Sequence, residues 1–271
     1  MGIGFVQYHS FQHSSFHRRK INCKSKQLPD FRFKNFLLDR RLPEVFLAKE
    51  QFELSRLAMS LVVVGVAGCS GTGKTTLCAK ISEFLKCEVI SGDDYLLPQD
   101  QCPPLDLTVL PWPDGETPAA FSPKRHDTNC PGCIDWPAFE NAVRQAIDEK
   151  SQSVVRSQLL LIESFLLLHS QFIVSKLNYL IRINVSEANW PDIIRRKWGR
   201  RHLGKASYQE RGVTFEEYSV YWSHYVVRRF HECAAGDAAR LRGTAAVVLE
   251  VDSSSPPDAT VQRLLSTLPP R

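Results

Sequence analysis

The chain has 271 residues, of which 43% are hydrophobic and 23% are charged. These fractions are ordinary for a globular protein and exclude a chain too polar to bury a core. No stretch reaches the roughly 20 apolar residues of a membrane-spanning helix, so we expect no membrane partner. Residues 1–58 hold 11 Lys and Arg against 5 Asp and Glu, whereas residues 59–271 hold 23 against 24. Because the basic excess lies outside the larger part, we expect no nucleic-acid partner.

Residues 1–58 are expected to form a partly disordered N-terminal extension ahead of a folded domain at residues 59–271. Residues 1–29 contain no acid, and their basic, Ser-containing composition is typical of an organelle transit peptide. We favour two alternatives to a transit peptide. The extension is either a disordered tail without a targeting role, or an upstream stretch not used in the working protein, because Met59 lies just before the first predicted strand. Residues 36–58 are apolar enough for a helix. Eight scattered cysteines without a secretory signal indicate free thiols and a cytoplasmic protein.

Residues 61–85 read as a strand, a glycine loop and a helix. Residues 61–67 are apolar and mostly β-branched, as in a buried parallel strand. Residues 68–75, Gly-Cys-Ser-Gly-Thr-Gly-Lys-Thr, match the phosphate-loop pattern G-x-x-x-x-G-K-[ST] at every fixed position. Residues 76–85 have an amphipathic helical pattern. The expected nucleotide-binding residues are Gly68, Ser70, Gly71, Thr72, Gly73, Lys74, Thr75 and Thr76.

The chemistry of this loop is specific. Its glycines let successive backbone N–H groups point inward at a phosphate, and the helix N-terminus adds its positive dipole end. Lys74 is expected to reach the β- and γ-phosphates of ATP, and the Thr75 hydroxyl to bind Mg²⁺. The alternative is a glycine-rich turn that binds nothing, which the flanking strand and helix disfavour.

Strands and helices alternate along the rest of the chain. This alternation predicts an α/β fold of the P-loop NTPase type, with a parallel sheet sandwiched by helices and a lid region. Further strands are expected at residues 87–91, 157–162, 179–185 and 245–251, and helices at 136–148, 188–202, 215–234 and 258–268.

The proline-rich residues 97–133 lack periodicity and predict a long substrate loop. The loop ends in Cys130-Pro-Gly-Cys133, the one cysteine pair with metal-ligand spacing. A zinc site requires two more ligands, and only Cys102 and His126 are plausible. We therefore do not expect zinc or a redox role here.

Two acidic features follow predicted strands. In parallel sheets, ligands bind at the carboxyl ends of the strands. Asp93 follows the second strand, and Glu163 ends the third. Phosphoryl transfer requires a carboxylate that takes the proton of the attacking hydroxyl and another that holds Mg²⁺. We assign the first role to Asp93 and the second to Glu163; the alternative for Asp93 is a solvated turn or helix cap.

The basic run at residues 195–205 indicates a lid, for which we expect residues 188–212. A cluster of guanidinium groups can hold the transferring phosphoryl group, and Arg196 and Arg200 are the expected catalytic members together with Lys74. A solvated basic face or a nucleic-acid patch is the alternative.

Together these segments resemble the small-metabolite P-loop kinases of the uridine kinase group, and the nicotinamide riboside kinases in particular. The resemblance covers most of residues 60–235. Only its phosphate loop is highly specific; the other segments gain weight from their order and spacing. The segments that carry it are residues 68–76, 89–95 (Val-Ile-Ser-Gly-Asp-Asp-Tyr), 130–139 (Cys-Pro-Gly-Cys-Ile-Asp-Trp-Pro-Ala-Phe), 160–167, 195–201 and Tyr208-Gln209.

The resemblance implies transfer of the ATP γ-phosphate to the 5′-hydroxyl of a ribonucleoside, with nicotinamide riboside as the favoured acceptor and NAD biosynthesis as the context. In the family, an aromatic residue and a ribose-binding aspartate usually precede the Cys-Pro stretch. Here those positions are Thr128 and Asn129, with Asp127 beside them. Asp93, Glu163, Asn129 and Asp127 are therefore the expected acceptor-site residues, and Tyr208 is expected to stack on the base.

Three alternatives stay open at this stage. One alternative keeps the reaction and changes the acceptor to uridine, cytidine or another small alcohol such as pantothenate. Another is a nucleotide-binding regulatory protein. A GTPase is disfavoured because the chain has no guanine-selecting Asn-Lys-x-Asp segment. The sequence leaves the oligomeric state and the choice between ATP and GTP open.

Overall fold

The structure is a computed structural model that describes residues 61–121, 124–152, 158–201, 206–242 and 244–267. The chain divides into two units, and every described residue belongs to the second, Leu47–Arg271. The predicted N-terminal extension, including the helix expected within residues 36–58, lies outside the described residues.

A five-stranded sheet forms the centre of the described domain. Its strand order is β2-β5-β1-β6-β7, and all four pairings between neighbouring strands are parallel. The predicted α/β fold with a parallel sheet is therefore confirmed. The sheet strands are β1 (Leu61–Gly68), β2 (Glu88–Ser91), β5 (Gln158–Ser164), β6 (Tyr179–Asn184) and β7 (Val247–Asp252).

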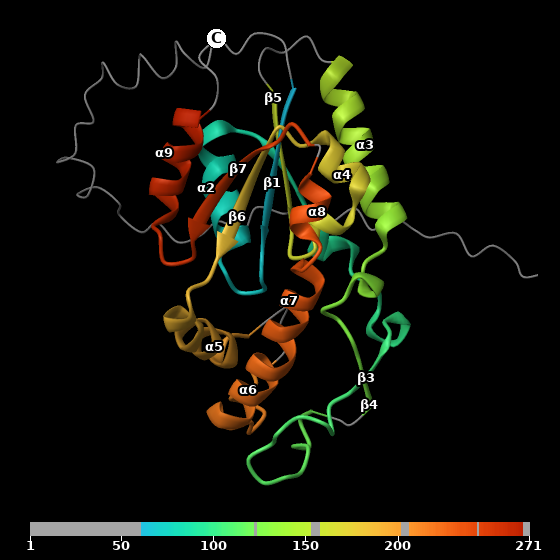
Figure 1. Cartoon of the computed structure of the whole chain (residues 1–271), viewed down its shortest axis with the longest axis vertical. Helices are drawn as coiled ribbons and strands as arrows, with labels where there is room; N and C mark the ends of the chain where they lie inside the picture. The colour runs from blue at the N-terminus through green and yellow to red at the C-terminus, as the bar shows by residue number, and fades with distance from the viewer. Residues whose placement is uncertain (1–60, 122–123, 153–157, 202–205, 243, 268–271) are drawn as a thin grey trace, which may run out of the picture. The chain divides into compact units, whose positions relative to one another are not determined.

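Helices cover both faces of this sheet (Figure 1). The helices α2 (Lys74–Leu85) and α9 (Pro257–Thr267) pack on one face, and α3 (Trp136–Gln152), α4 (Gln171–Lys176) and α8 (Asp237–Leu241) lie on the other. Two hydrophobic cores result, and both sides of β1 are buried. This explains the uninterrupted apolar run in its sequence. Among the described helices, none combines the length and the apolar character needed to cross a bilayer.

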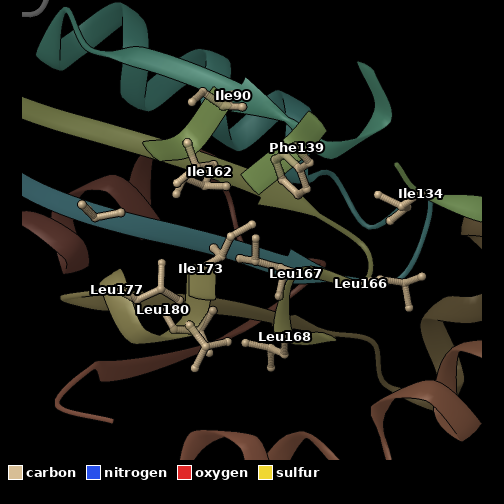
Figure 2. Packing of buried hydrophobic residues seen from close by; sticks show 14 of the residues in the cluster. Ile90, Ile134, Phe139, Ile162, Leu166, Leu167, Leu168, Ile173, Leu177 and Leu180 are labelled. Carbon is tan, nitrogen blue, oxygen red and sulfur yellow. The ribbon is translucent and has the colours of Figure 1, made fainter. Parts of the chain in front are cut away.

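Figure 2 shows the core under α3 and α4. Side chains from the strands β1, β2, β5 and β6 meet side chains from these helices and from the turn after β5. All of them are buried, as expected for the interior of a three-layer domain. They include Ile90, Ile162 and Leu180 from the strands, Phe139 from α3, Ile173 from α4, and Leu167 from the turn.

Helices α5, α6 and α7 lie beyond the carboxyl ends of the strands (Figure 1). Helix α5 spans Trp190–Gly199, and a continuous helical segment then runs through α6 (Phe215–Tyr221) and α7 (Arg228–Ala234). The predicted helix at residues 215–234 is confirmed in extent, but its middle, Trp222–Val227, is π-helical. Thr214 and Glu217 form a capping box that starts α6.

The predicted substrate loop is more ordered than its proline content suggests. It contains an antiparallel pair, β3 (Pro104–Asp106) with β4 (Lys124–His126), between short turns. Leu107, Trp112 and Phe121 are buried in a third core with side chains of α5, α6 and the π-helical turn. These large apolar residues order the connection, and they lack the regular spacing by which a sequence reveals a strand or helix.

Candidate active site

The phosphate loop has the backbone geometry that its glycines allow. Gly71 and Gly73 have φ angles of 80° and 98°, in the left-handed region that favours glycine. Helix α2 begins directly afterwards, so its first N–H groups face the loop. Ser70 is half-buried within the loop, whereas Thr76 is exposed on the first turn of α2.

Lys74 is buried at the base of the loop, with only 8% of its surface exposed. Its Nζ donates a hydrogen bond to the Cys69 carbonyl over 3.1 Å, and the Thr72 hydroxyl donates to the same oxygen over 2.9 Å. Burial lowers the pKa of Lys74, and the nearby carboxylates of Asp93 and Glu163 oppose that shift. A buried ammonium with such a pKa is stabilised by an anionic ligand.

Glu163 connects the phosphate loop to the second strand. The parallel register places it opposite Ser91 of β2. Its Oε1 accepts a hydrogen bond from the Ser91 hydroxyl over 3.1 Å, and its Oε2 accepts one from the Thr75 hydroxyl over 3.2 Å. Glu163 is 3% exposed, and burial raises the pKa of its carboxyl against the influence of Lys74. A carboxylate beside a threonine hydroxyl is a suitable oxygen set for Mg²⁺.

Asp93 lies in a short turn, Gly92–Tyr95, directly after β2, and its side chain is exposed. Its backbone N–H lies 3.4 Å from the Ser91 hydroxyl oxygen. Its carboxylate is close enough to raise the pKa values of Lys74 and Lys197. The structure therefore brings Asp93, Glu163 and the phosphate loop together at the carboxyl ends of the strands.

Lys197 on α5 is a site residue that the sequence reasoning missed. A Cβ atom at Gly71 would lie 3.2 Å from its Cε, so its side chain packs directly on the phosphate loop. Burial lowers the pKa of Lys197, and the charges of Arg200 and Lys74 add to that shift. Arg196 and Arg200, the members of the run that were expected to act, are both exposed. The basic run was the signal, but it did not tell which member faces the loop.

Two of the expected acceptor residues, Asp127 and Asn129, lie beside the helical segment at residues 215–234. Asp127 is 4% exposed, and its carboxylate accepts hydrogen bonds from Tyr225 and Arg229. Asn129 is half-buried beside it. The Tyr208 ring stacks on Phe121 with centroids 5.4 Å apart.

The guanidinium carbon of Arg211 lies 4.1 Å from the Tyr208 ring centroid. The Tyr218 ring is also close, with its centroid 4.6 Å from that of Tyr208, so a base that stacks on Tyr208 meets neighbours that already surround the ring.

Burial disfavours the thiolate form of cysteines in both the phosphate loop and the substrate loop. Burial raises the pKa of the Cys69 thiol to about 11 and that of Cys133 to about 12, which opposes the thiolate form that metals bind. Within the described ranges, no group of three or more His, Cys, Asp or Glu side chains has a geometry that could hold a metal ion.

A cavity of about 160 Å³ lies at the carboxyl ends of β1 and β6, between the turn after β5 and helix α7. Neither Lys74, Asp93 nor Glu163 lines it. Gly68, at the start of the phosphate loop, does line it, but the three charged groups that suit phosphate chemistry do not, so we do not place the acceptor there.

No family model matches this chain, and no curated protein sequence matches it significantly. Solved structures resemble it at low identity. A sugar kinase from Janibacter sp. HTCC2649 is 15% identical, with a TM-score of 0.40 over 77% of this chain and 95% of the other. A gluconokinase from Sinorhizobium meliloti 1021 is 14% identical, with a TM-score of 0.37 over 77% and 91% of the two chains. A shikimate kinase from Bacteroides thetaiotaomicron is 13% identical, with a TM-score of 0.37 over 76% and 98%.

Proposed function

We propose that this protein is an ATP-dependent kinase that phosphorylates the 5′-hydroxyl of a ribonucleoside, with nicotinamide riboside as the favoured acceptor. One observation carries the proposal: Glu163 accepts hydrogen bonds from the hydroxyls of Thr75 and Ser91, and its charge acts on the buried ammonium of Lys74. A cation, a metal-ligand pair and an adjacent exposed carboxylate are the groups that phosphoryl transfer to an alcohol requires.

The phosphate-binding part of the proposal rests on the loop. Its backbone N–H groups and the start of α2 bind the β- and γ-phosphates of ATP. Lys74 leaves the Cys69 carbonyl and pairs with these phosphates, because an anion offsets the cost of its burial. Lys197 contacts the same loop and neutralises charge on the transferring group.

Thr75 and Glu163 are the residues that hold Mg²⁺ in this proposal, and their oxygens already lie side by side. An ion held by these residues would supply positive charge to the phosphates. Glu163 must be ionised to bind it, and the opposing charge of Lys74 favours that form.

Asp93 acts on the acceptor. Its exposed carboxylate takes the proton of the attacking hydroxyl as the new O–P bond forms and the bond from the γ-phosphorus to the ADP oxygen breaks. The neutral amide of Asn129 donates hydrogen bonds to the ribose hydroxyls and accepts hydrogen bonds from them. Closure of residues 188–212 excludes water, so that phosphate passes to the alcohol and not to solvent.

The proposal is tested by measuring ADP release by the full-length protein with Mg·ATP and one acceptor at a time. The acceptors are nicotinamide riboside, uridine, cytidine and pantothenate, with gluconate and shikimate added because two structural neighbours carry those names. Turnover that is fastest with nicotinamide riboside supports the proposal. Turnover that is fastest with another alcohol keeps the mechanism and changes the substrate. ATP binding without turnover on any acceptor favours the regulatory alternative.

A further inference from the structure

The segment at residues 127–129, which precedes the Cys-Pro turn, is fixed through one buried carboxylate. Asp127 Oδ1 accepts hydrogen bonds from the Tyr225 hydroxyl over 2.5 Å and from the Asn129 backbone N–H over 2.8 Å. Its Oδ2 accepts one from Arg229 Nε over 2.8 Å. Such bonds to a charged group are the stronger kind, and their partners come from a helix about 100 residues further along the chain.

The three carbonyls of this segment are also engaged. Each faces a buried thiol: Cys130 Sγ lies 3.5 Å from the first carbonyl oxygen, Cys133 Sγ 3.3 Å from the second and Cys233 Sγ 4.0 Å from the third. Thiols are weak donors, so these contacts help to orient the three carbonyls but add little to the stability of the fold. The segment is thus fixed along its backbone as well as at its first side chain.

Asp127 has little capacity left for a ligand. It is almost wholly buried, it already accepts three hydrogen bonds, and its charge is paired with Arg229. The side chains that the segment leaves accessible are those of Thr128, which is exposed, and Asn129, which is half-buried and within hydrogen-bond reach of the Tyr225 hydroxyl. The Asn129 amide has a donor NH2 group on one side and an acceptor oxygen on the other. Its orientation must therefore be held accurately if it is to match a pair of hydroxyls.

We propose that Tyr225 and Arg229 are positioning residues that act through the Asp127 carboxylate to hold Asn129 for a neutral polyol acceptor. This inference rests on the proposed kinase function. It assigns Asp127 an anchoring role in place of direct contact with the ribose. It also gives the helix at residues 215–234 a role in acceptor affinity, although neither positioning residue touches the acceptor.

The chain contains a matched control for Arg229. Arg228 is its neighbour on the same helix and forms an ion pair with the same residue, Glu232, but not with Asp127. We compare Arg229→Gln and Tyr225→Phe with Arg228→Gln in the full-length protein, measuring the KM for acceptor and for ATP. The proposal expects the first two to raise the acceptor KM about 10-fold, with the KM for ATP within twofold of wild type. Arg228→Gln should change neither.

A second measurement needs no catalysis. The Asn129 N–H donates to Asp127, so its hydrogen exchange reports on the anchor directly. We expect exchange in peptides that cover residues 127–130 to speed up in Tyr225→Phe and Arg229→Gln and to be unchanged in Arg228→Gln. A higher acceptor KM together with faster exchange supports the proposal.

The opposing outcomes are distinct. If hydrogen exchange at residues 127–130 is unchanged in Tyr225→Phe and Arg229→Gln, Asp127 does not anchor the segment through these two residues. Faster exchange with an unchanged acceptor KM, or with an equal rise in the KM for ATP, shows a structural role only and overturns the positioning. A wild-type protein that phosphorylates nothing in the acceptor panel refutes the proposed function instead, and exchange still tests the anchor. Arg229 is partly exposed, so its variant remains informative if Tyr225→Phe fails to fold.

Discussion

Replacing Lys197 by Met should lower activity without destabilising the protein. If Lys197 neutralises the transferring phosphoryl group, its loss should lower kcat by about 10²- to 10³-fold, the typical cost of removing one preorganised stabilising group. Burial and the charges of Arg200 and Lys74 lower the pKa of Lys197, so the fold disfavours its ammonium form. Methionine keeps most of the side-chain volume against Gly71 and removes the charge. The free energy of unfolding should therefore stay equal or rise.

The two effects are measured separately, kcat by ADP release and the free energy of unfolding by urea titration. Arg195→Met is the control, because Arg195 lies on the same helix but stacks on Phe215, with its guanidinium carbon 4.4 Å from the ring centroid. We expect it to change kcat by less than about threefold, as is usual for a surface charge away from the chemistry. A wild-type kcat in Lys197→Met, or an equal loss in both variants, would refute the reasoning.

Three further predictions follow from single contacts. Asp93→Asn should lower kcat by about 10²- to 10⁴-fold while calorimetric binding of Mg·ATP stays within a few-fold of wild type; an equal loss of both contradicts its role as base. Trp112→Phe should cost about 1–3 kcal/mol more in urea unfolding than Trp222→Phe, because Trp112 Nε1 donates to the Leu107 carbonyl whereas Trp222 Nε1 has no partner among the described residues; equal costs contradict this. Because the pKa of Glu163 is raised in the folded protein, its contribution to stability is complete below the ordinary glutamate pKa and is lost as pH rises through the folded value. The free energy of unfolding of Glu163→Gln should therefore rise relative to that of wild type from acidic to neutral pH. A difference between the two proteins that does not change with pH argues against this reasoning.

The sequence was sufficient for the sheet because its strands are buried on both faces. Residues 61–67 and 159–162 are nearly continuous apolar runs, and each became a central strand. The positions of Asp93 and Glu163 followed from a topological rule, since parallel strands bring their carboxyl ends to one edge. Helices α4 and α8 were missed because they have 6 and 5 residues, too few to show a helical period.

The remaining parts of the site depend on helix phase and on contacts between distant residues. The basic run predicted a lid, but only the rotation of α5 about its axis decides that Lys197 faces the loop. The two helical partners of Asp127 lie 98 and 102 residues away. Tyr225 lies within the π-helical turn and Arg229 just after it, and this turn shifts the helix phase and leaves no regular pattern in the sequence. The pattern of neighbouring residues in the sequence predicts neither the orientation of Lys197 nor the partners of Asp127.

The three buried charges around the loop share one energetic property. Burial lowers the pKa of Lys74 and of Lys197 and raises the pKa of Glu163, so in each case the surroundings disfavour the charged form. A polyphosphate beside the two lysines and a divalent cation beside the glutamate reverse all three preferences, because each supplies the opposite charge. The site therefore gives up stability in the free protein that its proposed ligands restore on binding. The two hydrophobic cores of the sheet, which lie outside this site, offset that cost.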